Sequence, residues 1–551
     1  MSRRNLLNRT SRLRTRVSAI LALAIIALLV APASTASAAD YAPITGAGSS
    51  WSSNAVDQWR RNVQQYGMRV NYASTGSVDG RNQFKAGTVD YAVSETPYGL
   101  KDNGVVDTLP SRGFAYMPLV AGGTAFMYNL KAGGKSITNL RLSGEVLTKI
   151  FTGEITRWDD AEIKEDNPGL SLPKRQIVPV VRSDGSGSTA QFTLWMAEQH
   201  QSLWDSYCKK AGRSTPCGLT SNYPIVNGKG FVAQPNSQGV SGYVAQKANE
   251  GTITYVEYSY ALKTGYPVAK VLNNSGYYVE PTASNVAVGL LGAKINTNKN
   301  SSAYLTQDLT GVYKSKDDRA YPLSSYSYII VPTQVQGIFT KDKGTTLAAF
   351  ANYFLCEGQQ QAEVLGYSPL PINLVKAGLD QVKKIPGAVT KSVDIKKCNN
   401  PTFSKDGTNT LAKKAPQPDA CDKKGATQCN KGTGGAKGDT PTTTNPDTAT
   451  DDTTTDDDST DTTTGDGTSV TDTGTSTGNT GTNGGAGLTG PVSCDADTGA
   501  CAVVNAVPIE APAPNGWGPM QSLITAVIVV VVLLIFGPPL LIAAARKGKR
   551  S

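Results

Sequence analysis

The sequence predicts an α/β protein whose first strands lie parallel in one sheet. Two observations lead to this prediction. Between residues 41 and 401, short β-rich runs alternate with amphipathic segments, and a helix, a strand, a helix and a strand follow one another between residues 54 and 94. A strand, a crossover helix and a second strand form a βαβ unit, which makes the two strands parallel. With 551 residues, 39% of them hydrophobic, the chain has enough apolar material for a substantial core.

The elements follow in order. Val56, Trp59, Val63 and Tyr66 recur at helical spacing and Gly67 ends the pattern, which predicts a helix over 54–67. "MRVNYAS" then alternates as a strand, "DGRNQFKAG" forms a short helix, and "VDYAVS" is the next strand. Farther along, "SYIIVP" followed by "TTLAAFANYFLC" repeats the order of strand and helix.

Both ends of the chain carry targeting signals. Residues 1–38 combine six arginines, a 14-residue apolar stretch and a final Ala-Ser-Ala, which predicts a cleaved signal peptide. Residues 522–545 form an apolar stretch of about 24 residues, enough to cross a hydrocarbon core of ~30 Å as a transmembrane helix. The basic 546–551 tail predicts a cytoplasmic end. We therefore expect a single-pass protein of the cell membrane, with its folded part on the extracytoplasmic face.

Residues 402–520 are expected to be a disordered linker rich in Thr, Asp and Gly, because the stretch from Gly438 to Gly487 offers almost nothing to bury. An exported chain favours disulfides. Pairing of sequence neighbours, one arrangement of several that eight cysteines allow, predicts four bridges: Cys208/Cys217, Cys356/Cys398, Cys421/Cys429 and Cys494/Cys501. The lack of a C-x-x-C motif argues against zinc, and we expect neither a metal nor a cofactor.

Composition also limits the chemistry. His200 is the one histidine of the sequence and is expected to be a half-exposed helix residue. A histidine-based catalytic triad is therefore improbable, and an H-E-x-x-H metal site is excluded because it needs two histidines. The part between the signal peptide and the linker is basic, which suits an anionic ligand. Nucleic acid is a weaker interpretation, because no basic stripe interleaved with aromatic residues is present.

Three turns rich in Ser and Gly stand at junctions between the predicted elements. They are "GAGSSWSS" (46–53), "STGSVDG" (74–80) and "RSDGSGST" (182–189). A helix start leaves unpaired N–H groups and a partial positive charge that hold an anion, and glycine lets the backbone approach it closely. A capping box or a tight turn would explain any one of them. All three together, one carrying Arg182, predict a site for a compact oxyanion.

Protonation indicates which oxyanion fits. Near pH 7 phosphate still carries a hydrogen and sulfate carries none, so a carboxylate acceptor in the site favours phosphate. Glu95, in "VDYAVSETPY" just after a predicted strand, is the candidate acceptor; a solvated loop acid is the alternative.

These residues resemble a known family. "ITGAGSSW", "VNYASTGSVDG", "TVDYAVSETPY", "ITRWDDAEIKEDNPGLSLP", "VVRSDGSGST", "GYVAQKANEGTITYVEYSYA" and "GYSPLP" are similar, in this order, to the substrate-binding protein of the high-affinity phosphate ABC transporter. The resemblance covers about residues 43–387. It implies the two-lobed periplasmic-binding-protein (type II) fold with a hinge. Lobe 1 would comprise 39–119 and 263–398, and lobe 2 would comprise 120–262.

The resemblance also implies a function and a site. The chain would capture inorganic phosphate between the lobes and deliver it to an ABC permease with its ATPase, and would not be an enzyme. Carried over residue by residue, the phosphate-binding residues are Ser50, the backbone of Trp51, Ser77, Glu95, Arg182, Ser186, Gly187 and Ser188, with Asp184 orienting Arg182.

The sequence departs from the family at several of these positions. Glu95 stands where the family has aspartate, so its acceptor reaches one methylene farther, and Asp79 adds a carboxylate near the second turn. We expect Asp79 to point outward, because a loop acid prefers water. The long stalk leaves a surface sensor or adhesion protein as the alternative function. A phosphoester-cleaving enzyme is the weakest reading, because the sequence around Ser186 does not match G-x-S-x-G.

Overall fold

The computed structural model describes residues 41–102, 104–301, 303–389, 393–404, 407–436, 438–444, 492–494 and 501–503. Two compact units divide the chain, Met1–Thr455 and Asp456–Ser551, and the fold below is that of the first. The expected signal peptide, membrane span, basic tail and most of the expected linker lie outside the described residues. Among the helices that are described, none combines the length and apolar character needed to span a bilayer.

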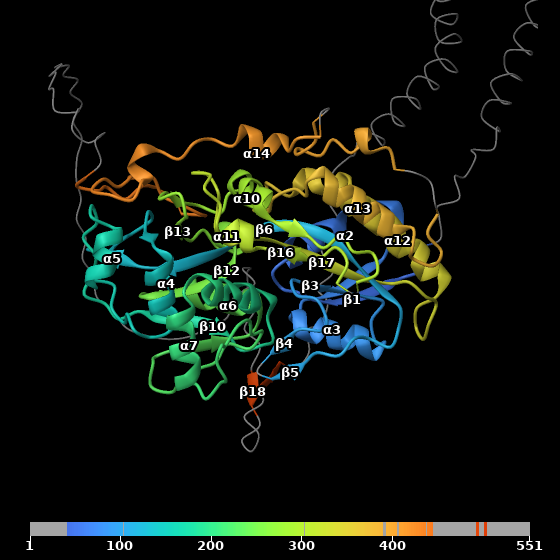
Figure 1. Cartoon of the computed structure of the whole chain (residues 1–551), viewed down its shortest axis with the longest axis horizontal. Helices are drawn as coiled ribbons and strands as arrows, with labels where there is room; N and C mark the ends of the chain where they lie inside the picture. Colours follow the sequence, from blue (N-terminus) through green and yellow to red (C-terminus); the bar gives the residue numbers. More distant parts are fainter. Residues whose placement is uncertain are drawn as a thin grey trace, which may run out of the picture. The chain divides into compact units, whose positions relative to one another are not determined.

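One long strand joins the two lobes. Among the described residues, eleven strands form a single sheet, and β6 (Phe114–Asn129) runs through its middle (Figure 1). Its first part pairs antiparallel with β17 (Ser324–Pro332) as far as Gly123, and its second part pairs antiparallel with β12 (Thr252–Glu257) from Thr124 onward. The lobes therefore separate between Gly123 and Thr124, slightly later than the boundary expected after residue 119.

Lobe 1 contains the predicted βαβ units. The strands β1 (Ile44–Gly48), β2 (Val70–Ala73) and β3 (Tyr91–Ser94) are parallel, as expected. The helices of this lobe are α2 (Ser53–Asn62), α3 (Ser77–Ala86), α10 (Ala283–Gly289), α11 (Thr310–Tyr313), α12 (Lys341–Leu355) and α13 (Ile372–Val382). The helix predicted over 54–67 is α2 followed by a 3-10 turn, and it ends at Gly67, whose φ of 81° is left-handed. Its buried Trp59 stacks on Phe354.

Lobe 2 is built around an aromatic core. Phe126, Phe151, Phe192 and Tyr255 pack with ring centroids 5.0–5.9 Å apart. The strands are β9 (Arg141–Leu142), β10 (Val178–Arg182), β11 (Val232–Gln234), β12, β13 (Val268–Leu272) and β14 (Tyr278–Val279). The helices are α4 (Gly144–Phe151), α5 (Ala161–Asp166), α6 (Gly187–Gln199), α7 (Gln201–Lys210), α8 (Asn236–Val244) and α9 (Tyr258–Thr264). Three short strand pairs described in this unit lie outside the eleven-stranded sheet. They are β4 (Lys101–Asp102) with β5 (Val105–Val106), β7 (Lys131–Ala132) with β8 (Lys135–Ser136), and β15 (Lys294–Ile295) with β16 (Gln307–Asp308).

The pairing differs from the sequence-based expectation in two respects. The sheet is mixed, because β6 and β17 run antiparallel to their neighbours, whereas strands linked by helical crossovers are parallel. In addition, β13 pairs with the lobe-2 part of β6 at Met127 and Phe126. The chain therefore remains in lobe 2 beyond the expected residue 262, since β propensity alone does not specify which sheet edge a strand joins.

The beginning of the expected linker is folded. The described segments 402–404, 407–436 and 438–444, together called the strap below, run across both lobes (Figure 1). In lobe 1, α14 (Thr410–Lys414) packs on α10, and Arg319 Nη1 donates to the carbonyls of Ala412 and Ala415. In lobe 2, Lys270 Nζ forms a buried ion pair with Asp422 at 2.5 Å. The expectation of a disordered linker from residue 402 is therefore wrong for the strap, most of which precedes the Thr- and Asp-rich run that begins at Gly438.

Three of the expected disulfides are present. They join Cys208 to Cys217, Cys356 to Cys398, and Cys421 to Cys429, the last within the strap. In the second unit, β18 (Val492–Cys494) pairs antiparallel with β19 (Cys501–Val503), and their backbones place residue 494 opposite 501. The fourth bridge stays a prediction.

Candidate functional site

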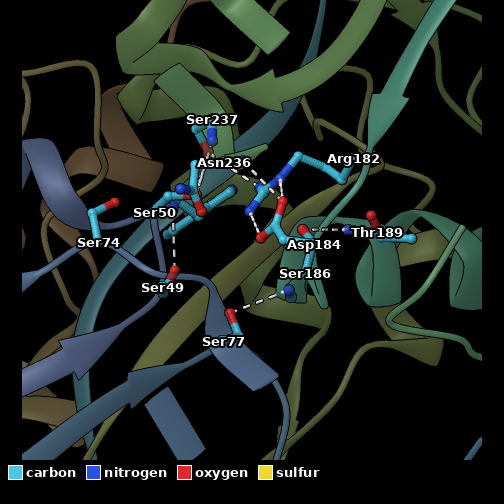
Figure 2. A network of polar contacts seen from close by, with 12 residues as sticks. Ser49, Ser50, Ser74, Ser77, Arg182, Asp184, Ser186, Thr189, Asn236 and Ser237 are labelled. Atoms are coloured by element: carbon cyan, nitrogen blue, oxygen red, sulfur yellow. Dashed lines mark hydrogen bonds and ion pairs between the residues drawn. The ribbon is translucent and has the colours of Figure 1, made fainter. Parts of the chain in front are cut away.

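The predicted site residues come together where the lobes meet. Ser50 follows β1, Ser77 begins α3 after β2, and Glu95 follows β3, so lobe 1 presents them at one edge of its parallel strands. Lobe 2 contributes Arg182 at the end of β10 and the start of α6 just after it (Figure 2). The side chains of this set are buried, with exposed fractions of 3% or less: Ser50, Trp51, Ser77, Glu95, Arg182, Ser186 and Ser188.

Glu95 is the acceptor at the centre of the lobe-1 side. The Ser49 hydroxyl donates to its Oε1, and the Ser77 hydroxyl donates to its Oε2 at 2.6 Å. Burial raises the pKa of the Glu95 carboxyl, while these two hydroxyl bonds and the charge of Arg182 act in the opposite direction. Each carboxylate oxygen keeps a further lone pair, so Glu95 can still accept a hydrogen from a ligand.

The longer reach of Glu95 places its carboxylate against the start of α6. A Cβ on Gly187 would stand 1.9 Å from Glu95 Oε2, so the approach requires glycine there. The Gly187 N–H donates to Ser77 Oγ at 3.1 Å, and the Val78 N–H donates to the carbonyl of Gly185, also at 3.1 Å. The beginnings of α3 and α6 therefore touch directly across the two lobes.

Arg182 is held by Asp184, as the resemblance implied. Its Nε and Nη2 bind the two oxygens of Asp184 at 2.7 and 2.5 Å, and the Asn236 N–H donates to Asp184 Oδ1 at 2.8 Å. The guanidinium of Arg182 is thus fixed in a two-point ion pair and cannot rotate freely. Asp184 is therefore engaged by three donors, one more than Glu95, and its charge is paired with that of Arg182.

The start of α6 supplies further donors. Ser186 is the N-cap, and its Oγ accepts from the Thr189 N–H at 3.2 Å. Ser188 is 1% exposed, and its Oγ has no hydrogen-bond partner among the described residues. Buried polar groups are nearly always paired, so an unpaired hydroxyl at a helix start is typical of a ligand-binding position.

The other positions singled out from the sequence lie around this set. The Trp51 indole is buried against Tyr367, and the backbone N–H of Trp51 donates to Ser49 Oγ at 3.1 Å. Asp79 is exposed and points outward, as expected, where its Oδ2 accepts from Gln83 Nε2 at 2.5 Å. His200 is partly buried beside Trp195, away from these residues, and burial lowers its pKa.

The sequence-based reasoning missed Ser49, Asn236 and Ser237. Ser49 neighbours a predicted residue and follows β1 directly. Asn236 and Ser237 begin α8, a fourth helix start at the site that was not predicted from the sequence. "PNSQGV" offers a Pro, a polar pair and an apolar residue, the usual signs of a helix start, but a sequence does not show that this start lies beside Arg182.

Chemically, the arrangement fits a small anion that carries one hydrogen. Hydroxyls, the guanidinium and helix-start amides can donate to such an anion, while the carboxylate of Glu95 can accept its hydrogen and would repel an anion that has none. The selectivity expected from the sequence therefore has a geometric basis.

The comparisons with known proteins agree with this chemistry. The family model of the PBP superfamily domain matches residues 33–357. The phosphate-binding protein PstS of Xylella fastidiosa (strain Temecula1) is 33% identical over 338 residues, which is 60% of this chain and 83% of the relative. PstS of Haemophilus influenzae is 30% identical over 346 residues, which is 62% of this chain and 92% of the relative.

Among solved structures, a high-affinity periplasmic phosphate-binding protein with bound phosphate is similar at 18% identity and a TM-score of 0.47, over 64% of this chain and 100% of that one. The family match and the close relatives lead to one assignment. The chain belongs to the phosphate-binding proteins of the PBP superfamily.

Proposed function

We propose that this protein captures inorganic phosphate between its two lobes and delivers it to an ABC permease. The observation that carries the proposal is the convergence of Ser50, Ser77, Arg182 and the start of α6 around the buried acceptor Glu95. The relatives named phosphate-binding protein PstS support it. The family is one of binding proteins, so the chain is not an enzyme.

The phosphate would lie among the eight residues that the sequence indicated: Ser50, Trp51, Ser77, Glu95, Arg182, Ser186, Gly187 and Ser188. Hydrogen bonds to a charged group contribute about 1.5–3 kcal/mol each. Six such bonds exceed the ~8 kcal/mol of a micromolar complex before the costs of ordering and desolvation are subtracted. Micromolar or tighter binding is therefore expected.

Closure of the lobes would follow binding. Donors for the anion come from both lobes, so a bound phosphate interacts more strongly with the closed form than with an open one and shifts the equilibrium toward closure. Gly122 and Gly123, where β6 passes from one lobe to the other, lie at the expected hinge.

Delivery to a permease requires the protein to stay near the membrane. The apolar stretch 522–545 with its four following cations supports a single-pass anchor, with the binding domain on the extracytoplasmic face. This part of the proposal rests on the sequence.

Isothermal titration calorimetry of the full chain tests the function. Phosphate is expected to bind with a stoichiometry of one and a micromolar or lower Kd, and sulfate is expected to bind at least ~100-fold more weakly, since Glu95 repels an anion without a hydrogen. No heat with phosphate, or equal affinity for sulfate, would contradict the proposal.

A further inference from the structure

The first turn of α8 is fixed to the arginine of the site. Asn236 adopts a left-handed conformation, with φ of 58°, and its N–H donates to Asp184 at 2.8 Å. This arrangement directs the next residue, Ser237, inward. Ser237 is 0% exposed and lies between Ser50 and Arg182 (Figure 2).

Ser237 contacts both lobes of the site. Its N–H donates to Ser50 Oγ at 2.9 Å, and the two hydroxyl oxygens are also 2.9 Å apart. On its other side, Arg182 Nη1 donates to Ser237 Oγ at 3.4 Å. Ser50 belongs to lobe 1, while Ser237 and Arg182 belong to lobe 2. The two contacts between Ser237 and Ser50 therefore form only when the lobes are closed, whereas the bond from Arg182 lies within lobe 2.

The numbers of donors and acceptors on these groups indicate which hydroxyl donates in the contact between Ser50 and Ser237. A serine hydroxyl has one hydrogen and two lone pairs. The Ser237 N–H occupies one lone pair of Ser50. Arginine only donates, so Ser237 Oγ accepts from Arg182 and can give its own hydrogen to the second lone pair of Ser50. In that arrangement both acceptor positions of Ser50 are filled by Ser237, and the Ser50 hydrogen is left for an anion.

We propose that Ser237 is a positioning residue of the phosphate site, a role that rests on the proposed function. It turns the Ser50 hydroxyl into a donor directed at the anion, and it links that donor to Arg182 across the closed cleft. Ser237 acts through these two neighbours and does not itself need to touch phosphate.

A double-mutant cycle in the full chain tests this role. The phosphate Kd is measured by calorimetry for wild type, Ser50→Ala, Ser237→Ala and the double variant, and the unfolding temperature of each is recorded without phosphate. Loss of a hydrogen bond that serves a charged ligand corresponds to roughly ten-fold weaker binding for Ser237→Ala. Because Ser237 acts through Ser50, the double variant is expected to bind about as weakly as Ser50→Ala alone.

Gly242→Ala is the matched control in the same helix, because an added Cβ there meets nothing within 4 Å. It is expected to leave the phosphate Kd unchanged. An unchanged Kd in Ser237→Ala, or single effects that multiply in the double variant, would overturn the inference while the proposed function stands. Multiplying effects would mean that Ser237 only stabilises α8. Absence of phosphate binding by wild type would overturn both.

Discussion

The acceptor role of Glu95 gives the most direct test of specificity. Glu95→Gln keeps the size and shape of the side chain, and the amide oxygen can still accept from Ser49 or Ser77. What changes is the charge and one acceptor, because an amide nitrogen donates where a carboxylate oxygen accepts. Glutamine has nearly the same side-chain volume as glutamate, so the close packing of this side chain against Gly187 is preserved.

The expected change in anion affinity follows from the burial and hydrogen bonding of Glu95. Glu95 is 1% exposed, so the bond proposed between it and the phosphate hydrogen would form without competing water. A hydrogen bond to a charged group is worth about 1.5–3 kcal/mol, which corresponds to a loss of phosphate affinity of about 10- to 150-fold. Sulfate is expected to gain about ten-fold, since the carboxylate that repelled it is gone. The selectivity ratio should therefore fall by at least ~100-fold.

Calorimetric titration of wild type and Glu95→Gln with phosphate and with sulfate measures this ratio. Asp79→Asn is the matched control, because Asp79 is a carboxylate of the adjacent turn that faces solvent. It should leave both affinities unchanged. Equal losses for the two anions in Glu95→Gln would refute the reasoning, since they would mean that Glu95 merely supports the packing.

The Glu95 carboxyl also predicts that the preference for phosphate over sulfate depends on pH. Burial raises the Glu95 pKa above its ordinary value of 4.5. The folded protein therefore holds this proton more tightly than the unfolded chain, and the resulting stabilisation is complete below the ordinary value and lost as pH rises through the raised pKa. As pH falls through that raised pKa, Glu95 becomes protonated, loses its negative charge and presents a donor hydrogen at one of its two oxygens. The preference for phosphate over sulfate should decline in this range in wild type and stay flat in Glu95→Gln.

Three further predictions concern the closed form and the strap. Gly187→Ala would place a Cβ 1.9 Å from a carboxylate oxygen, so phosphate affinity should fall by about 10- to 100-fold by calorimetry, whereas Gly242→Ala should not change it. Lys270→Met leaves Asp422 charged and buried, which should cost about 3–5 kcal/mol in urea unfolding; Lys383→Met, from an exposed pair, should change stability by less than ~0.5 kcal/mol. Inserting Gly-Ser-Gly-Ser into residues 416–420 should let the phosphate-free protein open wider, because this stretch lies between the two lobe anchors of the strap, Ala415 and Asp422, which a fully extended chain can separate by at most about 25 Å. Small-angle scattering should then give a larger radius of gyration than the same insertion in the β7–β8 turn, and equal radii would show that the strap does not limit opening.

The sequence determined those parts of the molecule that depend on near neighbours. The helix at 54–67 and the glycine that ends it follow from helical spacing and from the freedom of Gly67 to adopt positive φ. The donors at the start of α6 were predicted because a Ser-Gly turn before a helix leaves its amides unpaired. Three disulfides joined sequence neighbours as expected.

The tertiary structure decided the contacts between segments far apart in the chain. Ser50 and Ser237 are 187 residues apart, and their contact depends on how two lobes close rather than on any local pattern. The strap is likewise stabilised by Lys270 and Arg319, which its own composition does not indicate. Periodicity and capping are encoded over a few residues, whereas the pairing of distant surfaces arises only when burial brings them together. For this reason the sequence predicted the candidate donors of the site, and only the fold showed which residues contact them.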